Sequence, residues 1–169
     1  MHSLTRCLVL HVLGRYFQAW SDAAVMDTFE RNGVCIFADY GLLPNGSVSV
    51  YNEMRISTPD GPLFNITGHA VPDGSGNPGH LSVTLGAQPF AAPYWIVVTG
   101  PIVDDGYDYV IVTDGLQATL WVLVRDLERY FANYDAAVQV ELKQLGFTSF
   151  YNTPILTNQT GCTYENEEY

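Results

Sequence analysis

The sequence is poor in basic side chains. Seven Lys and Arg stand against eighteen Asp and Glu among 169 residues, and the formal net charge is −11. Nucleic-acid binding depends on Lys and Arg because these side chains neutralise phosphates, so the shortage argues against a nucleic-acid partner. The same shortage argues against docking on anionic lipid.

Long apolar runs are also missing. No run reaches the roughly 20 residues that a membrane-spanning helix requires, so we expect no transmembrane segment. Residues 4–13 come closest to a signal core, but His11 interrupts them and no small-residue cleavage site is evident. We interpret this stretch as the first strand of the domain, so that no signal or leader is evident in the chain.

Metal-binding and catalytic patterns are absent as well. The three cysteines (Cys7, Cys35 and Cys162) and the four histidines (His2, His11, His69 and His80) show no ligand spacing, so we expect no metal site. No nucleophile elbow or acid pair appears either, and we expect no catalytic residue and no enzymatic activity. An acidic loop with Asp104, Asp105 and Asp108 could hold a cation weakly, although a solvated turn is favoured.

What the sequence does contain is typical of a single β domain covering residues 1–169. Hydrophobic residues make up 47% and aromatic residues 13%, which favours a packed core and strands. Turn signals such as Pro44-Asn45-Gly46 and Asp104-Asp105-Gly106 separate short β-branched and aromatic runs. The predicted strands are 12–20, 33–41, 47–56, 63–70, 80–86, 93–99, 107–113 and 118–125. Eight consecutive antiparallel strands predict an all-β, up-and-down barrel over about 12–125 with room for one small ligand.

One helix is predicted after the barrel, over about 129–145. Its approximate apolar stripe runs from Tyr130 to Leu145 and ends at Gly146. We expect this helix to pack on the outside wall of the barrel, and we expect an extended tail over 147–169.

Alternation with a period of two assigns side chains to the two faces of each strand. Asp39 favours water, so Cys35 and Phe37 lie outward with it and Tyr40 lies inward. Asn52 is polar on an inward row, where an unpaired amide would cost roughly 1–3 kcal/mol. It therefore needs a protein group, water or a ligand. The other inward side chains are Met54, Phe64, Trp121 and Leu123, with either Tyr94 or Trp95 according to the strand register.

Several of these positions fall within known motifs. These are Leu13-Gly14-Arg15-Tyr16-Phe17, Cys35-Ile-Phe-Ala-Asp-Tyr40 with Asn45-Gly-Ser-Val-Ser-Val-Tyr-Asn52, Pro93-Tyr-Trp-Ile96 and Leu120-Trp-Val-Leu-Val-Arg125. In this order and spacing they resemble the lipocalin family, in particular the apolipoprotein D and bacterial lipocalin branch, over nearly the whole chain. Tyr16 stands where the family has Trp. The family's Thr-Asp-Tyr motif is missing, and residues 99–106 form a longer loop instead.

The resemblance implies roles for individual residues. Tyr40, Asn52 and Trp121 occupy ligand-contacting positions of the branch. Arg125 is expected to stack on Tyr16 beside Gly14 and so close the barrel base, with a weaker latch than Trp would give. The branch also joins the positions of Cys35 and Cys162 in a disulfide, and alternation separately places Cys35 outward; this leaves Cys7 free or paired with another chain.

Three function hypotheses follow. The first is a carrier or store of a small hydrophobic ligand, such as a carotenoid or other pigment, a retinoid, a sterol or a fatty acid, with no obligatory cofactor. The second is a structural subunit of a larger protein assembly, with Phe37, Tyr51 and the helix face as interface. The third is a lipocalin-fold enzyme acting on an isoprenoid or lipid. The expected disulfide and three sequons, at Asn45, Asn65 and Asn158, indicate a secreted or organelle-lumenal glycoprotein in an oxidising compartment.

Overall fold

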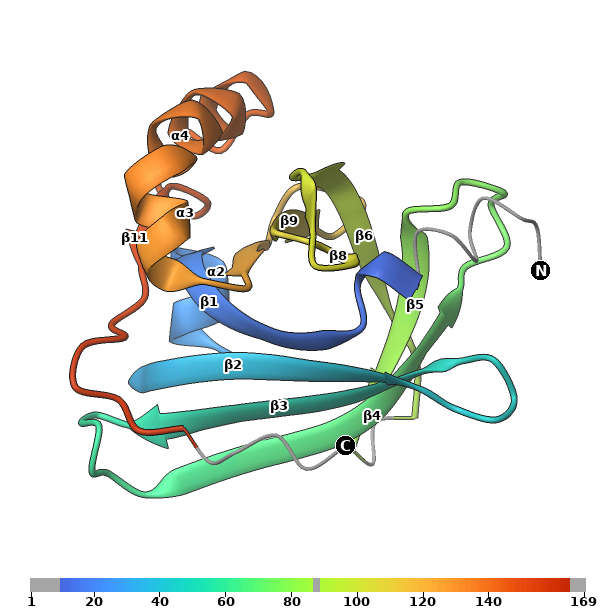
Figure 1. Ribbon diagram of the computed structural model, residues 1–169, viewed down its shortest axis with the longest axis horizontal. Helices are drawn as coiled ribbons and strands as arrows, with labels where there is room; N and C mark the ends of the chain where they lie inside the picture. The colour runs from blue at the N-terminus through green and yellow to red at the C-terminus, as the bar shows by residue number, and fades with distance from the viewer. Residues whose placement is uncertain (1–9, 87–88, 165–169) are drawn as a thin grey trace.

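The protein is described by a computed structural model that covers residues 10–86 and 89–164 (Figure 1). The eight long strands are β1 (Gly14–Asp22), β2 (Gly33–Leu42), β3 (Val48–Ile56), β4 (Leu63–Pro72), β5 (His80–Leu85), β6 (Ala92–Thr99), β9 (Tyr109–Thr113) and β10 (Leu120–Val124). Each pairs with the next in antiparallel register, and β10 pairs with β1, for example Phe17 with Val124. The predicted eight-stranded closed barrel is therefore confirmed.

The stretch before β1 differs from the prediction. Leu10 and His11 are helical, residue 12 is a turn, and the first strand begins at Gly14. Residues 4–9 lie outside the described part. The interpretation of this stretch as a strand is thus wrong for its last residues, because the short-range pattern of apolar side chains does not distinguish a helical turn from a strand.

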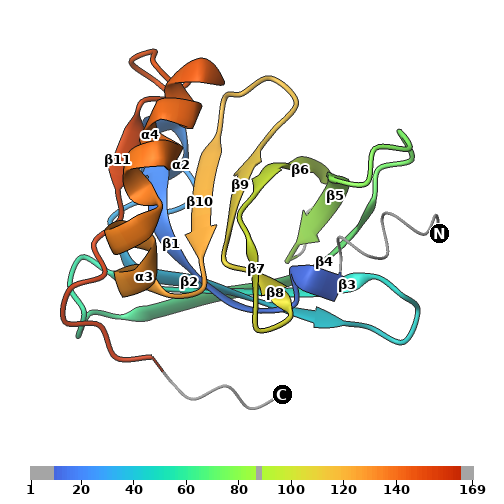
Figure 2. The same ribbon diagram turned by 45° about the horizontal axis from the view of Figure 1, so that its top comes forward.

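The helical region lies outside the barrel, as expected, but it is not one helix. It consists of α3 (Leu127–Asn133) and α4 (Asp135–Gln144), which are separated at Tyr134. Figure 2 shows both helices along the outer wall beside β1 and β10. The buried side chains of α4 are Val138 and Leu142. None of the helices in the described part of the chain is long and apolar enough to span a membrane.

Two separate clusters of apolar side chains result from this arrangement. One fills part of the barrel interior and includes Tyr16, Tyr40 and Leu123. The other lies between the barrel wall and the helices, and it includes Tyr130 and Leu142. The barrel interior and the helix contact are thus two separate apolar cores.

The C-terminal segment completes the barrel wall. β2 pairs with β1 only along Gly14–Phe17, and the short strand β11 (Pro154–Leu156) pairs with the end of β1, Trp20 to Asp22. The Gln159 side chain follows β11 and donates through Nε2 to the carbonyl oxygens of Gln18, 2.9 Å, and Ile36, 2.7 Å. The tail therefore fills the gap that opens between β1 and β2.

Candidate functional site: a cavity inside the barrel

The closed end of the barrel is defined by Gly14, Tyr16, Gly106 and Arg125. The guanidinium carbon of Arg125 lies 4.5 Å from the centre of the Tyr16 ring. Its N–H groups donate to the carbonyl oxygens of Tyr107, 3.0 Å, and of Leu13 and His11, 2.5 and 3.3 Å. The Tyr16 hydroxyl also donates to the Tyr107 carbonyl, at 2.9 Å. At the base, the charge of Arg125 is thus stabilised by the Tyr16 ring and by the carbonyl oxygens that accept its hydrogen bonds.

Two glycines allow this close approach. A Cβ on Gly14 would lie 2.9 Å from Nη1 of Arg125, and a Cβ on Gly106 would lie 2.2 Å from Nη2. Gly106 belongs to a small hairpin of β7 (Ile102–Val103) and β8 (Gly106–Tyr107), which replaces the missing family motif. Figure 2 shows this hairpin beside the start of β1. The longer loop thus forms part of the base.

Above this base lies a cavity of about 250 Å³. It is lined by all seven side chains predicted to contact a ligand: Tyr40, Asn52, Met54, Phe64, Tyr94, Trp121 and Leu123. Most of the remaining lining is aliphatic, for example Val50 and Val83. The strand register also determines which of the two aromatic neighbours on β6 faces the cavity. Tyr94 does, because Trp95 lies outside the barrel, where its ring stacks on His80 at 3.9 Å between ring centres. The cavity is therefore mostly apolar, as ligand sites are.

A tyrosine pair and one amide bring polar atoms into the cavity. The hydroxyls of Tyr40 and Tyr94 lie 2.6 Å apart, and burial raises the pKa of both, so they stay neutral. The Oδ1 atom of Asn52 is buried and has no hydrogen-bond partner in the described structure. An unpaired buried acceptor costs stability.

Glu30 is a polar lining residue that sequence reasoning missed. It follows α2 (Ala23–Asp27) in the β1–β2 loop, and its carboxylate lies at the cavity. The Gln18 side chain donates to Oε2 at 2.7 Å and the Trp121 indole donates to Oε1 at 3.0 Å. Burial raises the pKa of Glu30 to about 7, while these two hydrogen bonds act in the opposite direction. No local pattern in the Glu30-Arg31-Asn32-Gly33 segment separates this residue from a solvated loop residue.

The mouth of the cavity lies at the opposite end of the barrel from Arg125. Phe29 and Phe64 both line the cavity and are exposed to solvent, at 63% and 48% of their surface. We call this region, with Glu30, the open end. Glu30 is thus placed where an entering molecule would pass.

The side chains on the outward face of β2 are buried, whereas the prediction exposed them to water. Asp39 does not face water, because both its oxygens accept from Arg15, at 2.7 and 2.8 Å, and the residue is buried. Phe37 is buried too: Arg15 lies 4.1 Å above its ring, and the Tyr164 ring packs at 5.8 Å. Phe37 therefore cannot serve as the exposed interface of a structural subunit.

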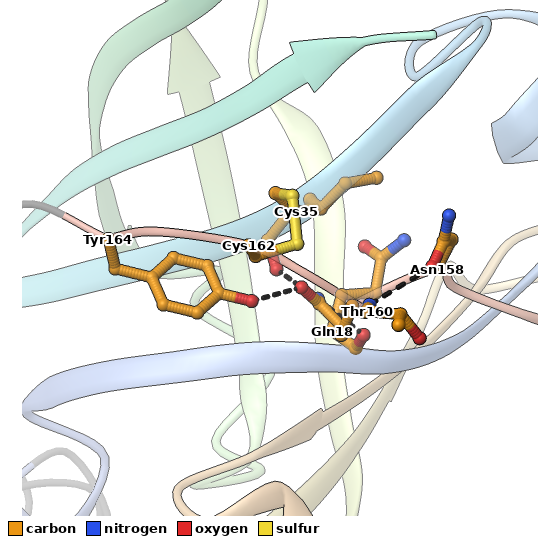
Figure 3. Close-up of a disulfide and its surroundings, with 8 residues drawn as sticks. Gln18, Cys35, Asn158, Thr160, Cys162 and Tyr164 are labelled. Atoms are coloured by element: carbon orange, nitrogen blue, oxygen red, sulfur yellow. Dashed lines mark hydrogen bonds between the residues drawn. A yellow bond between two sulfur atoms is a disulfide. The ribbon is translucent and has the colours of Figure 1, made fainter. Parts of the chain in front are cut away.

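A disulfide joins Cys35 to Cys162 and anchors the tail on this face (Figure 3). Cys35 sits in a bulge of β2 with a φ of 55°, and its N–H donates to the Asn158 carbonyl at 2.9 Å. Tyr164 points back along the tail to donate to the side chain of Gln159. The bulge and the disulfide together hold the tail in the gap between β1 and β2.

Of the remaining sequence candidates, those in the described part of the chain lie apart from the cavity. Asn45, Asn65 and Asn158 are all exposed, while Cys7 lies outside the described residues. Asp108 does not form an acidic loop with its neighbours, because it is buried and accepts from Arg129 at 2.5 and 2.8 Å. Within residues 10–86 and 89–164, no group of three or more His, Cys, Asp or Glu side chains could hold a metal ion.

Comparisons with known proteins agree with this architecture. Residues 12–150 match the family model of the lipocalin-like domain. Apolipoprotein D of Rattus norvegicus is 34% identical over 86 residues, which cover 50% of this chain and 44% of that protein. Apolipoprotein D of Macaca fascicularis is 27% identical over 154 residues, which cover 83% of this chain and 77% of that protein. The chain thus spans less than half the length of the rat relative in the matched region.

Solved structures show the same fold. Lobster apocrustacyanin A1 has a TM-score of 0.59 at 18% identity, over 88% of this chain and 78% of that one. Japanin from Rhipicephalus appendiculatus, solved with bound cholesterol, has a TM-score of 0.56 at 14% identity, over 90% and 96% of the two chains. At these low sequence identities, the similarity shows only that the chains share the barrel fold.

Proposed function

Because this chain belongs to the lipocalin family, with apolipoprotein D among its relatives, we propose that it binds a small hydrophobic molecule in the barrel for transport or storage. The observation that carries the proposal is the cavity of about 250 Å³, which has a closed base, apolar walls and an open mouth. Transfer of a ligand from water to such walls is favourable because apolar surface is removed from water.

The ligand classes that suit these walls are a carotenoid or other pigment, a retinoid, a sterol or a fatty acid. A sterol is supported by one relative in fold, japanin, which was solved with cholesterol. The protein needs no cofactor in this proposal, since the bound molecule is the cargo. The cargo is expected to leave chemically unchanged, as in a carrier rather than an enzyme.

Native mass spectrometry of protein purified from its source tests the proposal. A carrier is expected to appear as one chain with one small hydrophobic molecule, which can be extracted and identified. A chain that appears only with protein partners and never with such a molecule would contradict the proposal. Conversion of the extracted molecule by the purified protein would point to an enzyme instead.

We also propose that the protein works in an oxidising compartment, secreted or lumenal, and carries glycans. This is supported by the bond between Cys35 and Cys162 and by the exposure of Asn45, Asn65 and Asn158. A thiol reagent applied without prior reduction should leave Cys35 and Cys162 unmodified. Their modification would contradict the oxidising compartment, and source protein whose mass is unchanged by deglycosylation would contradict the glycans.

A further inference from the structure

The polar groups around the cavity include the carboxylate of Glu30 and the amide of Asn52. The Asn52 amide has two N–H donors and one oxygen, and this oxygen is buried without a partner. Glu30 contributes a carboxylate that accepts two hydrogen bonds, from Gln18 and Trp121, although a carboxylate offers about four lone-pair sites. The Gln18 N–H group that faces Glu30 also donates to the Thr157 hydroxyl at 3.0 Å, so its donors are already used. A ligand head that reaches Glu30 therefore meets a carboxylate with free acceptor sites.

Positive charge is lacking on the same surface. Among the described residues that line the cavity there is no Lys, Arg or His. Arg125 lies behind the Tyr16 ring and donates to three carbonyl oxygens of the base. The donors left over are neutral: the hydroxyl proton that remains from the Tyr40–Tyr94 pair and the amide N–H groups of Asn52. A bound anion would find no charge to balance it.

On this basis, and resting on the proposed carrier function, we propose that Glu30 makes the cavity selective for hydrophobic molecules with a hydrogen-bond-donating head, an alcohol or an amine, over those that end in a carboxylate. An alcohol both donates to the Glu30 oxygens and accepts from the tyrosine pair. An amine donates to the same acceptors and, when protonated, pairs with the Glu30 carboxylate. The fatty acids among the candidate ligands are disfavoured.

The physical reason is the charge that a carboxylate ligand would place beside Glu30. Two like charges in a poorly solvated site repel each other, so one of them must take up a proton or leave. Asp22 lies near Glu30, and the charge of Asp22 also opposes the ionisation of Glu30. The charge of Glu30 in turn opposes the ionisation of Tyr94. The groups that face Glu30 are thus acidic or neutral, and a further anion has no compensation.

A matched set of ligands tests the proposal on the unmodified protein. Decanol, decylamine and decanoic acid each have ten carbons and differ in the head, and tryptophan fluorescence, to which Trp121 in the cavity wall contributes, reports their binding. At pH 7.5 we expect the alcohol and the amine to bind at least about tenfold more tightly than the acid. Equal or tighter binding of decanoic acid would overturn the selectivity. Failure of all three ligands, and of retinol and cholesterol, would instead contradict the carrier function.

The variant Glu30→Gln assigns the selectivity to this side chain. It keeps an oxygen that can accept from Gln18 or Trp121 but removes the charge, so we expect decanoic acid to bind several-fold more tightly, decylamine several-fold less tightly, and decanol almost unchanged. Glu128→Gln makes the same charge change on an exposed residue of α3 and should leave all three affinities unaltered. An unchanged ratio of acid to amine affinity in a folded Glu30→Gln protein would overturn the role of Glu30.

Discussion

The two ends of the barrel use polar groups in opposite ways. At the closed end, Arg125 and Tyr16 bind each other and three carbonyl oxygens. At the open end, Glu30 is partly buried with a raised pKa. Asn52, on the cavity wall, has an acceptor without a partner. Satisfied polar groups stabilise the fold, whereas unsatisfied ones cost stability and remain free for a ligand. The contrast therefore separates the part that holds the barrel together from the part that can bind.

Replacement of Arg125 should have the largest effect on stability. Arg125→Met keeps the aliphatic stem but leaves the carbonyls of Leu13 and His11 without the guanidinium and removes the stack on Tyr16. We expect the free energy of unfolding to fall by about 3 kcal/mol, as measured in urea. The matched change at exposed Arg31, in the open-end loop, should alter it by less than about 0.5 kcal/mol. A loss of similar size at both positions would remove the contrast between the ends.

The open end should give the protein an unusual pH dependence. Burial raises the pKa of Glu30 to about 7, so its contribution to stability is full below its unfolded pKa near 4.5 and is lost as pH rises through 7. Glu30→Gln should raise the free energy of unfolding by roughly 2–3 kcal/mol at pH 8 and hardly at all at pH 4.5. Buried Asp22, with its pKa raised to about 6, adds a dependence of the same sign that this variant retains. Equal effects of the variant at both pH values would contradict the burial of the carboxylate.

Removal of the Tyr16 hydroxyl should cost a moderate amount. The structure shows that this hydroxyl donates to the Tyr107 carbonyl, a contact that the family's Trp at this position cannot make in the same way. Tyr16→Phe keeps the ring under Arg125, so the expected loss is about 1 kcal/mol, measured by denaturant unfolding. A neutral result would mean that the ring alone forms the latch.

Removal of the Asn52 amide should have a smaller effect of opposite sign. Asn52→Leu replaces an unpaired buried acceptor by an apolar side chain of similar size, so the empty protein should gain up to about 1 kcal/mol. Decanol affinity should fall several-fold at the same time. A variant that is destabilised and binds decanol as before would show that the amide already has a structural partner.

The barrel could be predicted from the sequence because its signals are local. Turn residues and alternation lie within a few positions of each other, and they placed Tyr40, Asn52 and Trp121 on the cavity wall. The break at Tyr134 was missed because a break between two helices requires knowledge of tertiary contacts. One such contact is the bond of 2.7 Å from the Trp20 indole to Asp135 at the start of α4.

The surfaces that depend on distant segments could not be predicted. Alternation gave Phe37 and Asp39 the correct outward direction, but their burial depends on Arg15 and on a tail that lies more than 100 residues away. Glu30 was missed for a related reason: its loop reaches the cavity only because Gln18 and Trp121, from two different strands, donate to its carboxylate.

The central claim, that the cavity binds the ligand, is tested most directly by filling it. Ala70 is buried on the cavity wall, whereas Ala132 is exposed on α3, so Ala70→Phe and Ala132→Phe add the same volume inside and outside. Decanol titrations followed by tryptophan fluorescence should give wild-type affinity for Ala132→Phe and at least about tenfold weaker binding for a cooperatively unfolding Ala70→Phe. Wild-type affinity in the filled protein would contradict the claim.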